Sequence, residues 1–216
     1  METTETTETT ETTPVILHHR LAPEDQARVE FYALFARLYA RGPDVGMLQA
    51  LGSADPWPEA PDNPLGSAWN TLLLASQVMD ADAADQEYTD LFVGVGKCEV
   101  NLHASYWLTG FMMEKPLVEL RTDLTKLELA RRPGATILED HLSALCEAMR
   151  VLVAGEGERA PAPIATQRDF FERHLAPWVF LCCDATTQSP LANYYVRVAQ
   201  LTALFMAVER DALAIE

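Results

Sequence analysis

Asp140 and His141 are adjacent in the sequence and are the pair best suited to chemistry. A carboxylate beside an imidazole can take part in general acid–base catalysis. With His103 and His174, the pair could also supply the residues of an all-α metal-dependent hydrolase. Helical phosphohydrolases carry the doublet as His-Asp, however, and no other cluster of histidines and aspartates completes such a site in this sequence. An aspartate that caps a helix beside a partly exposed histidine is therefore the interpretation we favour from the residues alone.

The residues before this doublet predict where it lies. Thr136 and Glu139 have the spacing of a capping box, in which a threonine and a glutamate side chain satisfy the first backbone N–H groups of a helix. An apolar helical stretch follows directly. This start would place Asp140 and His141 in the first turn of that helix.

Other motifs for catalysis or for ligand binding are absent from the sequence. It contains no G-x-S-x-G nucleophile motif, no phosphate-binding loop and no glycine-rich dinucleotide motif. The four cysteines include no C-x-x-C pair, so we interpret them as reduced, buried thiols rather than as zinc ligands; they are Cys98, Cys146, Cys182 and Cys183. The sequence predicts no catalytic residue, no metal and no cofactor.

Apolar residues recur at helical spacing from Pro23 onward. The first stripe has members at i, i+3, i+4, i+7 and i+8, namely Phe31, Leu34, Phe35, Leu38 and Tyr39. Pro23 suits the first turn of this helix, and Gly42-Pro43 ends it. By the same criteria we expect helices at roughly 45–51, 64–79, 83–92, 116–132, 137–154, 165–184 and 190–214.

Proline and small polar residues predict several helix boundaries. Asn63-Pro64 and Ser189-Pro190 each place a capping side chain directly before a proline that fits the first turn. Pro177 should bend or interrupt its helix. Because no segment alternates with a period of two, we predict an all-α fold, a single compact helical bundle with irregular connecting loops.

The charge balance limits the classes of partner. Lys and Arg number 16 against 32 Asp and Glu, which gives a net charge of −16. Nucleic acids and anionic membrane surfaces are disfavoured because they attract basic proteins. An acidic surface favours solubility, and it also speeds encounters with cationic polypeptide segments.

The chain divides into a short tail and one domain. Residues 1–13 repeat Glu-Thr-Thr, and we expect residues 1–20 to be a disordered tail because such a tract has nothing to bury. Residues 21–216 are expected to form one helical domain. We find no secretory signal and no apolar run near the roughly 20 residues that a membrane span needs, so we expect a cytoplasmic protein.

Four stretches, in a fixed order across residues 25–210, resemble the TorD/DmsD/NarJ family of molybdoenzyme maturation chaperones. Residues 87–96 are similar to its aromatic-x-x-Leu-Phe-x-Gly-Pro-Gly motif, with Val95 in place of proline. Residues 102–108 resemble its small-Ser-x-aromatic segment. Residues 138–142 match the Asp-His core of its Glu-Pro-x-Asp-His signature, and residues 171–178 are similar to its His-Leu-x-Pro-Trp motif.

The resemblance implies a TorD-like helical bundle that binds the N-terminal leader of a DMSO-reductase-family catalytic subunit, often a twin-arginine leader. Such chaperones hold the subunit for insertion of the molybdenum cofactor before export. By position, the residues implied to contact the leader are Tyr88, Leu91, Phe92, Trp107, Asp140 and His141. A NarJ-like chaperone for a subunit that is not exported is the alternative. The family includes domain-swapped dimers, so both a monomer and a dimer stay open.

A leader with a cationic head and an apolar stretch calls for an apolar groove with carboxylates at its rim. Burial of four leader side chains contributes roughly 6–12 kcal/mol before costs, whereas ordering the leader costs about 2–5 kcal/mol. Exposed ion pairs add only about 0.2–1 kcal/mol each. Apolar contacts must therefore supply the affinity. Tyr88, Leu91 and Phe92 share one helix face, which suits either groove lining or ordinary core.

Overall fold

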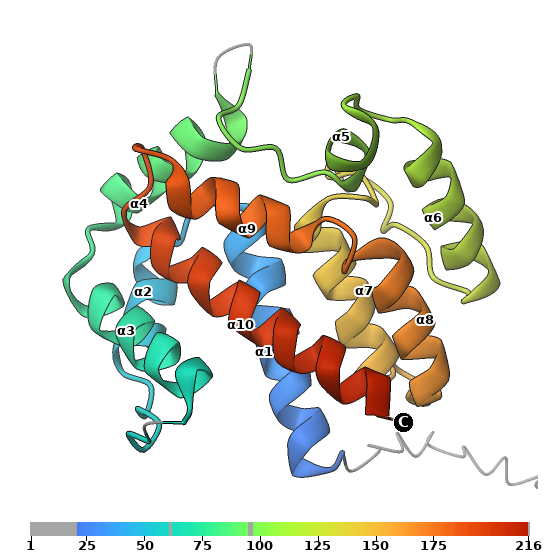
Figure 1. Ribbon diagram of the computed structural model, residues 1–216, viewed down its shortest axis with the longest axis horizontal. Coiled ribbons are helices and arrows are strands. Elements are labelled where there is room, and N and C mark those ends of the chain that lie inside the picture. Colours follow the sequence, from blue (N-terminus) through green and yellow to red (C-terminus); the bar gives the residue numbers. More distant parts are fainter. Residues whose placement is uncertain (1–20, 61, 95–96, 216) are drawn as a thin grey trace, which may run out of the picture.

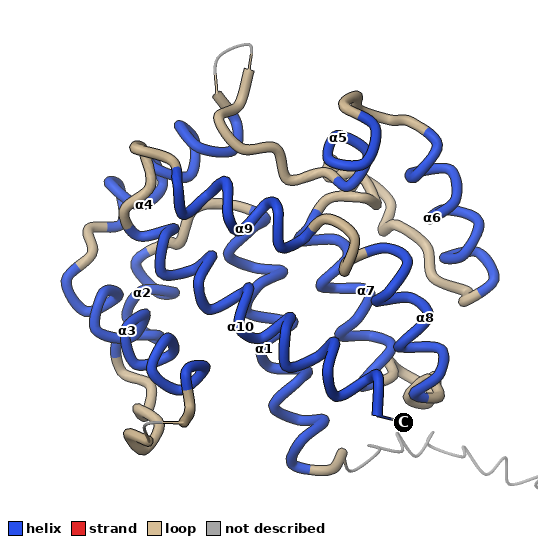
Figure 2. The backbone as a smooth tube through the Cα atoms, in the orientation of Figure 1, coloured by secondary structure: helices blue, strands red, loops and turns tan. Residues whose placement is uncertain are grey.

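The computed structural model describes residues 21–60, 62–94 and 97–215, and this part contains ten α-helices and one π-helical turn (Figures 1 and 2). No β-strand occurs in these ranges, where two isolated bridges, His103–His141 and Glu156–Arg159, are the only β-type pairings. The predicted all-α fold is confirmed. The predicted tail, residues 1–20, lies outside the described residues.

Most helices lie where the apolar periodicity predicts them, but α5 lies where no helix was predicted, and α6 ends at Lys126 rather than near residue 132. In chain order they are α1 (Pro23–Ala40), α2 (Val45–Gly52), α3 (Pro64–Val78), α4 (Ala81–Tyr88), the π-helical turn η1 (Thr89–Val93), α5 (Ala104–Thr109), α6 (Lys115–Lys126), α7 (Leu142–Ala154), α8 (Ile164–His174), α9 (Val179–Gln188) and α10 (Tyr194–Ile215). In the part of the chain that the structure covers, no helix is long and apolar enough to cross a membrane.

Two long helices form the centre of the bundle. α1 packs along α7, while α10 crosses the molecule and packs against α3, α8 and α9 (Figure 1). α5 and α6 lie together at one edge of the molecule. Buried aromatic rings join α1 to α10, and the centroids of Phe31 and Phe205 are 5.0 Å apart. The Glu209 carboxylate, also buried, accepts hydrogen bonds from Arg28 at 2.7 Å and from Tyr32 at 2.9 Å.

The predicted starts at Pro23 and Pro64 are confirmed, as is the break at Pro177. The Asn63 side chain accepts a hydrogen bond from the Gly66 N–H at 2.9 Å, as a helix cap should. α8 ends at His174, and α9 begins at Val179. Proline removes a backbone donor and crowds the preceding turn, which explains this interruption.

The predicted start at Ser189-Pro190 is wrong. Ser189 ends α9, and α10 begins only at Tyr194. The buried Glu87 carboxylate of α4 accepts hydrogen bonds from the backbone N–H groups of residues 193, 194 and 195, at 2.7–3.0 Å. A carboxylate from α4, distant in the sequence, thus accepts the hydrogen bonds of the free backbone N–H groups in the first turn of α10. A capping side chain next to this turn in the sequence is not needed.

The predicted capping box at Thr136 and Glu139 is also wrong. α7 begins at Leu142, and its N-terminal cap is His141, whose Nδ1 accepts a hydrogen bond from the Ser143 N–H at 3.1 Å. Glu139 instead accepts a hydrogen bond from Arg121 of α6 at 2.9 Å. Asp140 and His141 therefore precede the helix. The short bridge to residues 102–104 holds His141 in an extended conformation, and Asp140 lies in the turn before it.

The cysteines behave as expected of structural thiols. Cys146, Cys182 and Cys183 are buried, Cys98 is partly buried, and all four are free. Burial raises the pKa of Cys183 to about 12. Since the thiolate is the reactive form, these buried groups are poor nucleophiles.

Candidate peptide-binding site

Tyr88, Leu91 and Phe92 lie at the junction of α4 and η1, and all three are buried. The Phe92 ring packs against Tyr195, with centroids 5.0 Å apart, and the Tyr88 hydroxyl donates a hydrogen bond to the Tyr39 carbonyl at 3.1 Å. In this conformation the three side chains belong to the core. Their contact with a leader remains a prediction, and it would require η1 to move.

Trp107 and Asp140 are joined through α5 and the segment before it. Asp140 Oδ2 accepts hydrogen bonds from the Ser105 N–H at 3.0 Å and from the Ser105 hydroxyl at 2.6 Å. Half-buried Trp107, two residues later, donates from Nε1 to the Asn101 carbonyl at 2.7 Å. These bonds hold the Asp140 carboxylate against the N-terminus of α5 and hold the Trp107 ring against the segment that precedes α5.

The second carboxylate oxygen of Asp140 has a different environment. Asp140 is fully buried, and no described residue donates a hydrogen bond to Oδ1. Burying a polar atom without a partner costs roughly 1–3 kcal/mol, so such atoms are uncommon in folded proteins. Oδ1 is thus a buried hydrogen-bond acceptor that no described residue satisfies.

His141 lies beside Asp140 and packs edge-on against His103, with ring centroids 4.8 Å apart. Burial, with a smaller contribution from His103, lowers the pKa of His141 to about 3. The pKa of His103 is also lowered by burial, although the nearby Asp140 opposes this shift. Both rings are therefore neutral at pH 7.

The residues of the hydrolase alternative do not assemble into a metal site. Within the described ranges, no group of three or more His, Cys, Asp or Glu side chains is arranged to hold a metal ion. His174 instead shares a hydrogen bond with Asp123 of α6, with Nε2 and Oδ2 3.0 Å apart. The structure therefore gives no geometric support to a hydrolase that uses His103, Asp140, His141 and His174.

A small cavity of about 60 Å³ adjoins Asp140. α5, α6 and α8 enclose it, and the polar residues of its wall are Glu119, Asp140, Arg173 and His174. Arg173 forms an ion pair with Asp123 at 2.6 Å. Because the one cationic side chain in the cavity wall already has a carboxylate partner, the space beside Asp140 favours an added cation or hydrogen-bond donor.

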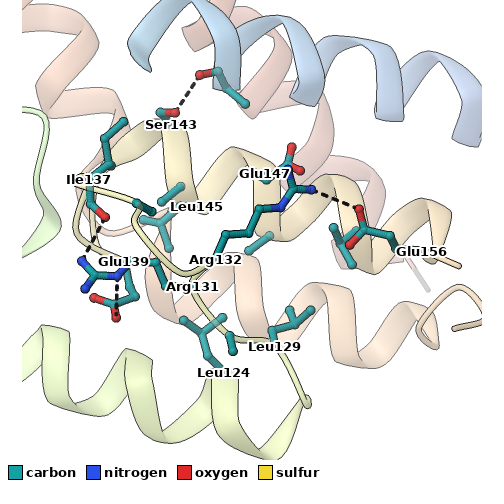
Figure 3. Close-up of a pocket in the computed structure, with 16 residues that line it drawn as sticks. Leu124, Leu129, Arg131, Arg132, Ile137, Glu139, Ser143, Leu145, Glu147 and Glu156 are labelled. Carbon is teal, nitrogen blue, oxygen red and sulfur yellow. Dashed lines mark hydrogen bonds and ion pairs between the residues drawn. The ribbon is translucent and has the colours of Figure 1, made fainter. Parts of the chain in front are cut away.

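A larger, mostly apolar groove of about 380 Å³ lies where α7 faces α6 and the connection between these helices (Figure 3). One wall is α7, with Leu145, Ala148 and Val151. The facing wall combines Leu124 of α6 with Leu129 from the connection between α6 and α7. Figure 3 shows the leucines at 124 and 129 on the side opposite the α7 ribbon. Several apolar side chains could be buried here at once.

Charged residues stand at the rim of the groove. Arg131 pairs with Glu139 at 4.0 Å, and Arg132 pairs with Glu156 at 3.4 Å. The two pairs lie on opposite sides of the close-up (Figure 3). Glu147, also in the lining, forms an ion pair with Arg150 at 2.8 Å. The groove therefore has the apolar lining and the carboxylate rim expected of a leader site, with arginines that partly balance its charge.

The residues of the large groove were not among the predicted contacts. Glu139, which lines the groove, directly precedes the predicted Asp140 and His141, and Ser143, which also lines it, follows them after one residue. The apolar stripes of α6 and α7 were visible in the sequence, but the sequence did not show that they face each other across a connection. No hydrogen bond or ring contact within the described residues joins the group of Tyr88, Leu91 and Phe92 to Asp140 and His141.

Comparison with known proteins places these features in one family. No curated protein matches the chain. The family model described as nitrate reductase delta subunit matches residues 58–184, more than half of the 216 residues. The matched region runs from the loop before α3 into α9 and contains all six predicted contact residues. The chain belongs to the nitrate reductase delta subunit family, the NarJ/TorD family of non-catalytic chaperones for molybdoenzyme maturation.

Proposed function

We propose that this chaperone binds the N-terminal leader of a DMSO-reductase-family catalytic subunit and holds the subunit for cofactor insertion before export. The observation that supports this most strongly is the apolar groove of about 380 Å³, whose lining includes Glu139, the residue before the buried Asp140. An apolar stretch of the leader would enter the groove, and a cationic side chain would pair with Asp140. We place this binding in the cytoplasm, where leaders are synthesised.

The size and lining of the groove fit the energetic requirement. A groove of this volume holds a few aliphatic side chains, each of which contributes roughly 1.5–3 kcal/mol when buried. The rim charges are partly exposed and already paired, so they add little affinity. Asp140 differs because it is buried, and a cation that reached it would form a strong charge-assisted hydrogen bond.

The predicted contacts then have two kinds of role. Asp140 and His141 lie on the connection before α7, and Trp107 lies on α5, which lines the small cavity with Ala104 and Leu108. We propose that these three predicted residues contact or orient the leader. Tyr88, Leu91 and Phe92 are core residues in this conformation. We propose that they contact the leader only when η1 is displaced.

A NarJ-like role is the second candidate, because the matching family model is described as nitrate reductase delta subunit. In that role the chaperone would bind the N-terminus of a subunit that is not exported, and a twin-arginine pair would not be needed. Two synthetic peptides from the N-terminus of the host's catalytic subunit separate the roles, one with its native sequence and one with every arginine replaced by glutamine. Equal affinity for both favours the NarJ-like role.

Fluorescence polarisation with the labelled native peptide tests the proposed site. Ala148→Glu places a carboxylate on the apolar wall of the groove and should weaken binding by about tenfold or more, equivalent to about 1.4 kcal/mol. Ala50→Glu makes the same change on the exposed surface of α2 and should leave affinity unchanged. Circular dichroism would establish that both variants fold. Equal affinity of Ala148→Glu and the unmodified protein would remove the groove from the proposed site.

A further inference from the structure

We infer that α6 is a lid over one continuous leader-binding groove, and that the two cavities are the parts of this groove left open when the lid is closed. This inference rests on the proposed function. It adds a conformational step, in which the arriving leader displaces α6.

The two cavities share their walls. Pro116, Glu119 and Leu120, from the first half of α6, line the small cavity, and Leu124, from its second half, lines the large groove. Across from α6, Glu139 lines the large groove and its neighbour Asp140 lines the small cavity. One helix and one turn thus border both spaces. If α6 moved away, the spaces would merge into one channel with an apolar end and an acidic end.

Asp140 cannot serve a client while α6 stays in place. Its side chain is fully buried, no described residue donates to Oδ1, and Asp140 lines a cavity that α6 helps to close. A cavity of about 60 Å³ is far smaller than the space that a peptide segment needs. A leader cation can therefore reach this oxygen only after α6 has moved.

α6 is built as a detachable element. It lies at the edge of the molecule beside α5 (Figure 1). Its polar contacts with its surroundings are made by Asp123, which contacts His174 at 3.0 Å and Arg173 at 2.6 Å on α8, and by the half-exposed Arg121, which donates to Glu139 at 2.9 Å. Met113 and Glu128, just outside its two ends, adopt left-handed backbone conformations with φ of 58° and 53°. Non-glycine residues adopt this conformation at an energetic cost, which a change in the lid could relieve.

The two ends of α6 differ, which indicates the direction of opening. Beyond its C-terminus, the Arg159 guanidinium contacts the backbone carbonyls of Leu127 and Glu128. Before its N-terminus, Phe111 and Met113 are about two-thirds exposed, at 69% and 68%. The C-terminal end is therefore the hinge, and the N-terminal end swings outward. The exposed apolar side chains there would meet the leader as it enters.

The occupant that fits the opened groove is a client segment with an apolar stripe and one cationic side chain. α6 itself places Leu117, Leu120 and Leu124 inward, at i, i+3 and i+7. A leader helix with the same spacing would replace those contacts. It would add a cation for Asp140, which α6 does not provide, because α6 contributes Glu119 to that wall. The leader would thus gain an interaction that the closed lid lacks.

Hydrogen exchange with and without the native leader peptide tests the lid. We expect leader binding to speed exchange in residues 115–126 and to slow it in residues 142–154, because α6 leaves while α7 becomes covered. A protein that binds the leader while α6 keeps or gains protection would overturn the lid and leave the proposed function standing. A protein that binds no leader in the polarisation assay would overturn the proposed function, and the lid inference with it.

Variants of the Arg173–Asp123 ion pair provide an independent test. Arg173→Ala removes the ion pair between α8 and Asp123 of α6. The fold should persist, because the Arg173 side chain is half-exposed. We expect exchange in α6 to rise by about tenfold without peptide, and leader association to become several-fold faster. Arg168→Ala, on the same helix, is the matched control and should do neither. Asp123→Ala should reproduce the effect from the lid side. Slower or unchanged association in Arg173→Ala would contradict the inference.

Discussion

At the residue scale, the two oxygens of the Asp140 carboxylate have different roles. Oδ2 is held by the Ser105 N–H and hydroxyl, which fixes the orientation of the side chain. No residue within the described ranges donates to Oδ1, and Asp140 lines the small cavity. A fixed carboxylate with one unmet acceptor is pre-organised for an incoming donor, because binding then costs little further ordering.

Asp140→Asn tests this role in a double-mutant cycle with the leader. Asparagine retains an oxygen that can accept from Ser105, so the fold should persist. The variant should weaken binding of the native leader by about tenfold and barely change binding of the leader with glutamine in place of arginine. Equilibrium titrations of the four combinations give the coupling energy. An equal loss with both leaders would show that Asp140 acts only on the structure of its own segment.

At the element scale, one side chain determines where the longest helix begins. The buried Glu87 carboxylate accepts hydrogen bonds from three backbone N–H groups at the start of α10. This contact also ties α4, next to η1, to the central helix. The position of Tyr88, Leu91 and Phe92 therefore depends on it.

Glu87→Ala should lower the free energy of unfolding by about 2–4 kcal/mol, because it leaves three backbone donors without their charged acceptor. Glu172→Ala, at an exposed position of α8, is a matched control and should cost less than about 0.5 kcal/mol. Urea denaturation followed by circular dichroism measures both. If the two variants were equally stable, the carboxylate would not be responsible for the start of α10.

The same contact shows what the sequence could and could not predict. The starts at Pro23 and Pro64 and the break at Pro177 were predicted, because proline and local caps act within one turn. The starts of α7 and α10 were not, because the Arg121–Glu139 pair and the Glu87 cap connect residues distant in the sequence. The groove was missed for a related reason: its walls come from α6, α7 and the connection between them.

For the whole molecule, the buried histidines make stability depend on pH. Burial lowers the pKa of His141 to about 3, from an ordinary value of 6.5. Below pH 6.5 His141 is protonated in the unfolded chain but stays neutral in the folded protein until the pH approaches 3. Stability is therefore complete above pH 6.5 and falls with decreasing pH, by at most about 1.4 kcal/mol per pH unit for this group. His103 and His174, whose pKa values are also lowered, add to the effect.

His141→Asn should flatten this dependence. Asparagine is a good helix cap and can accept the Ser143 N–H in place of the imidazole, so stability at pH 7.5 should change little. Between pH 6.5 and 4.5 the variant should lose less stability than the unmodified protein. Urea denaturation across this range measures the difference. Parallel pH profiles would mean that the folded protein protonates His141 as readily as the unfolded chain does.

The central claim is that the N-terminus of a catalytic subunit lies in the groove between α6 and α7. The most direct measurement places a photo-crosslinking amino acid at Ala148 in the groove or, as a control, at Ala50 on α2, and maps the products formed with the full-length catalytic subunit by mass spectrometry. We expect crosslinks from position 148 to the first few tens of residues of the subunit, and none from position 50. Crosslinks from position 148 only to the body of the subunit, or to the same residues as from position 50, would contradict it.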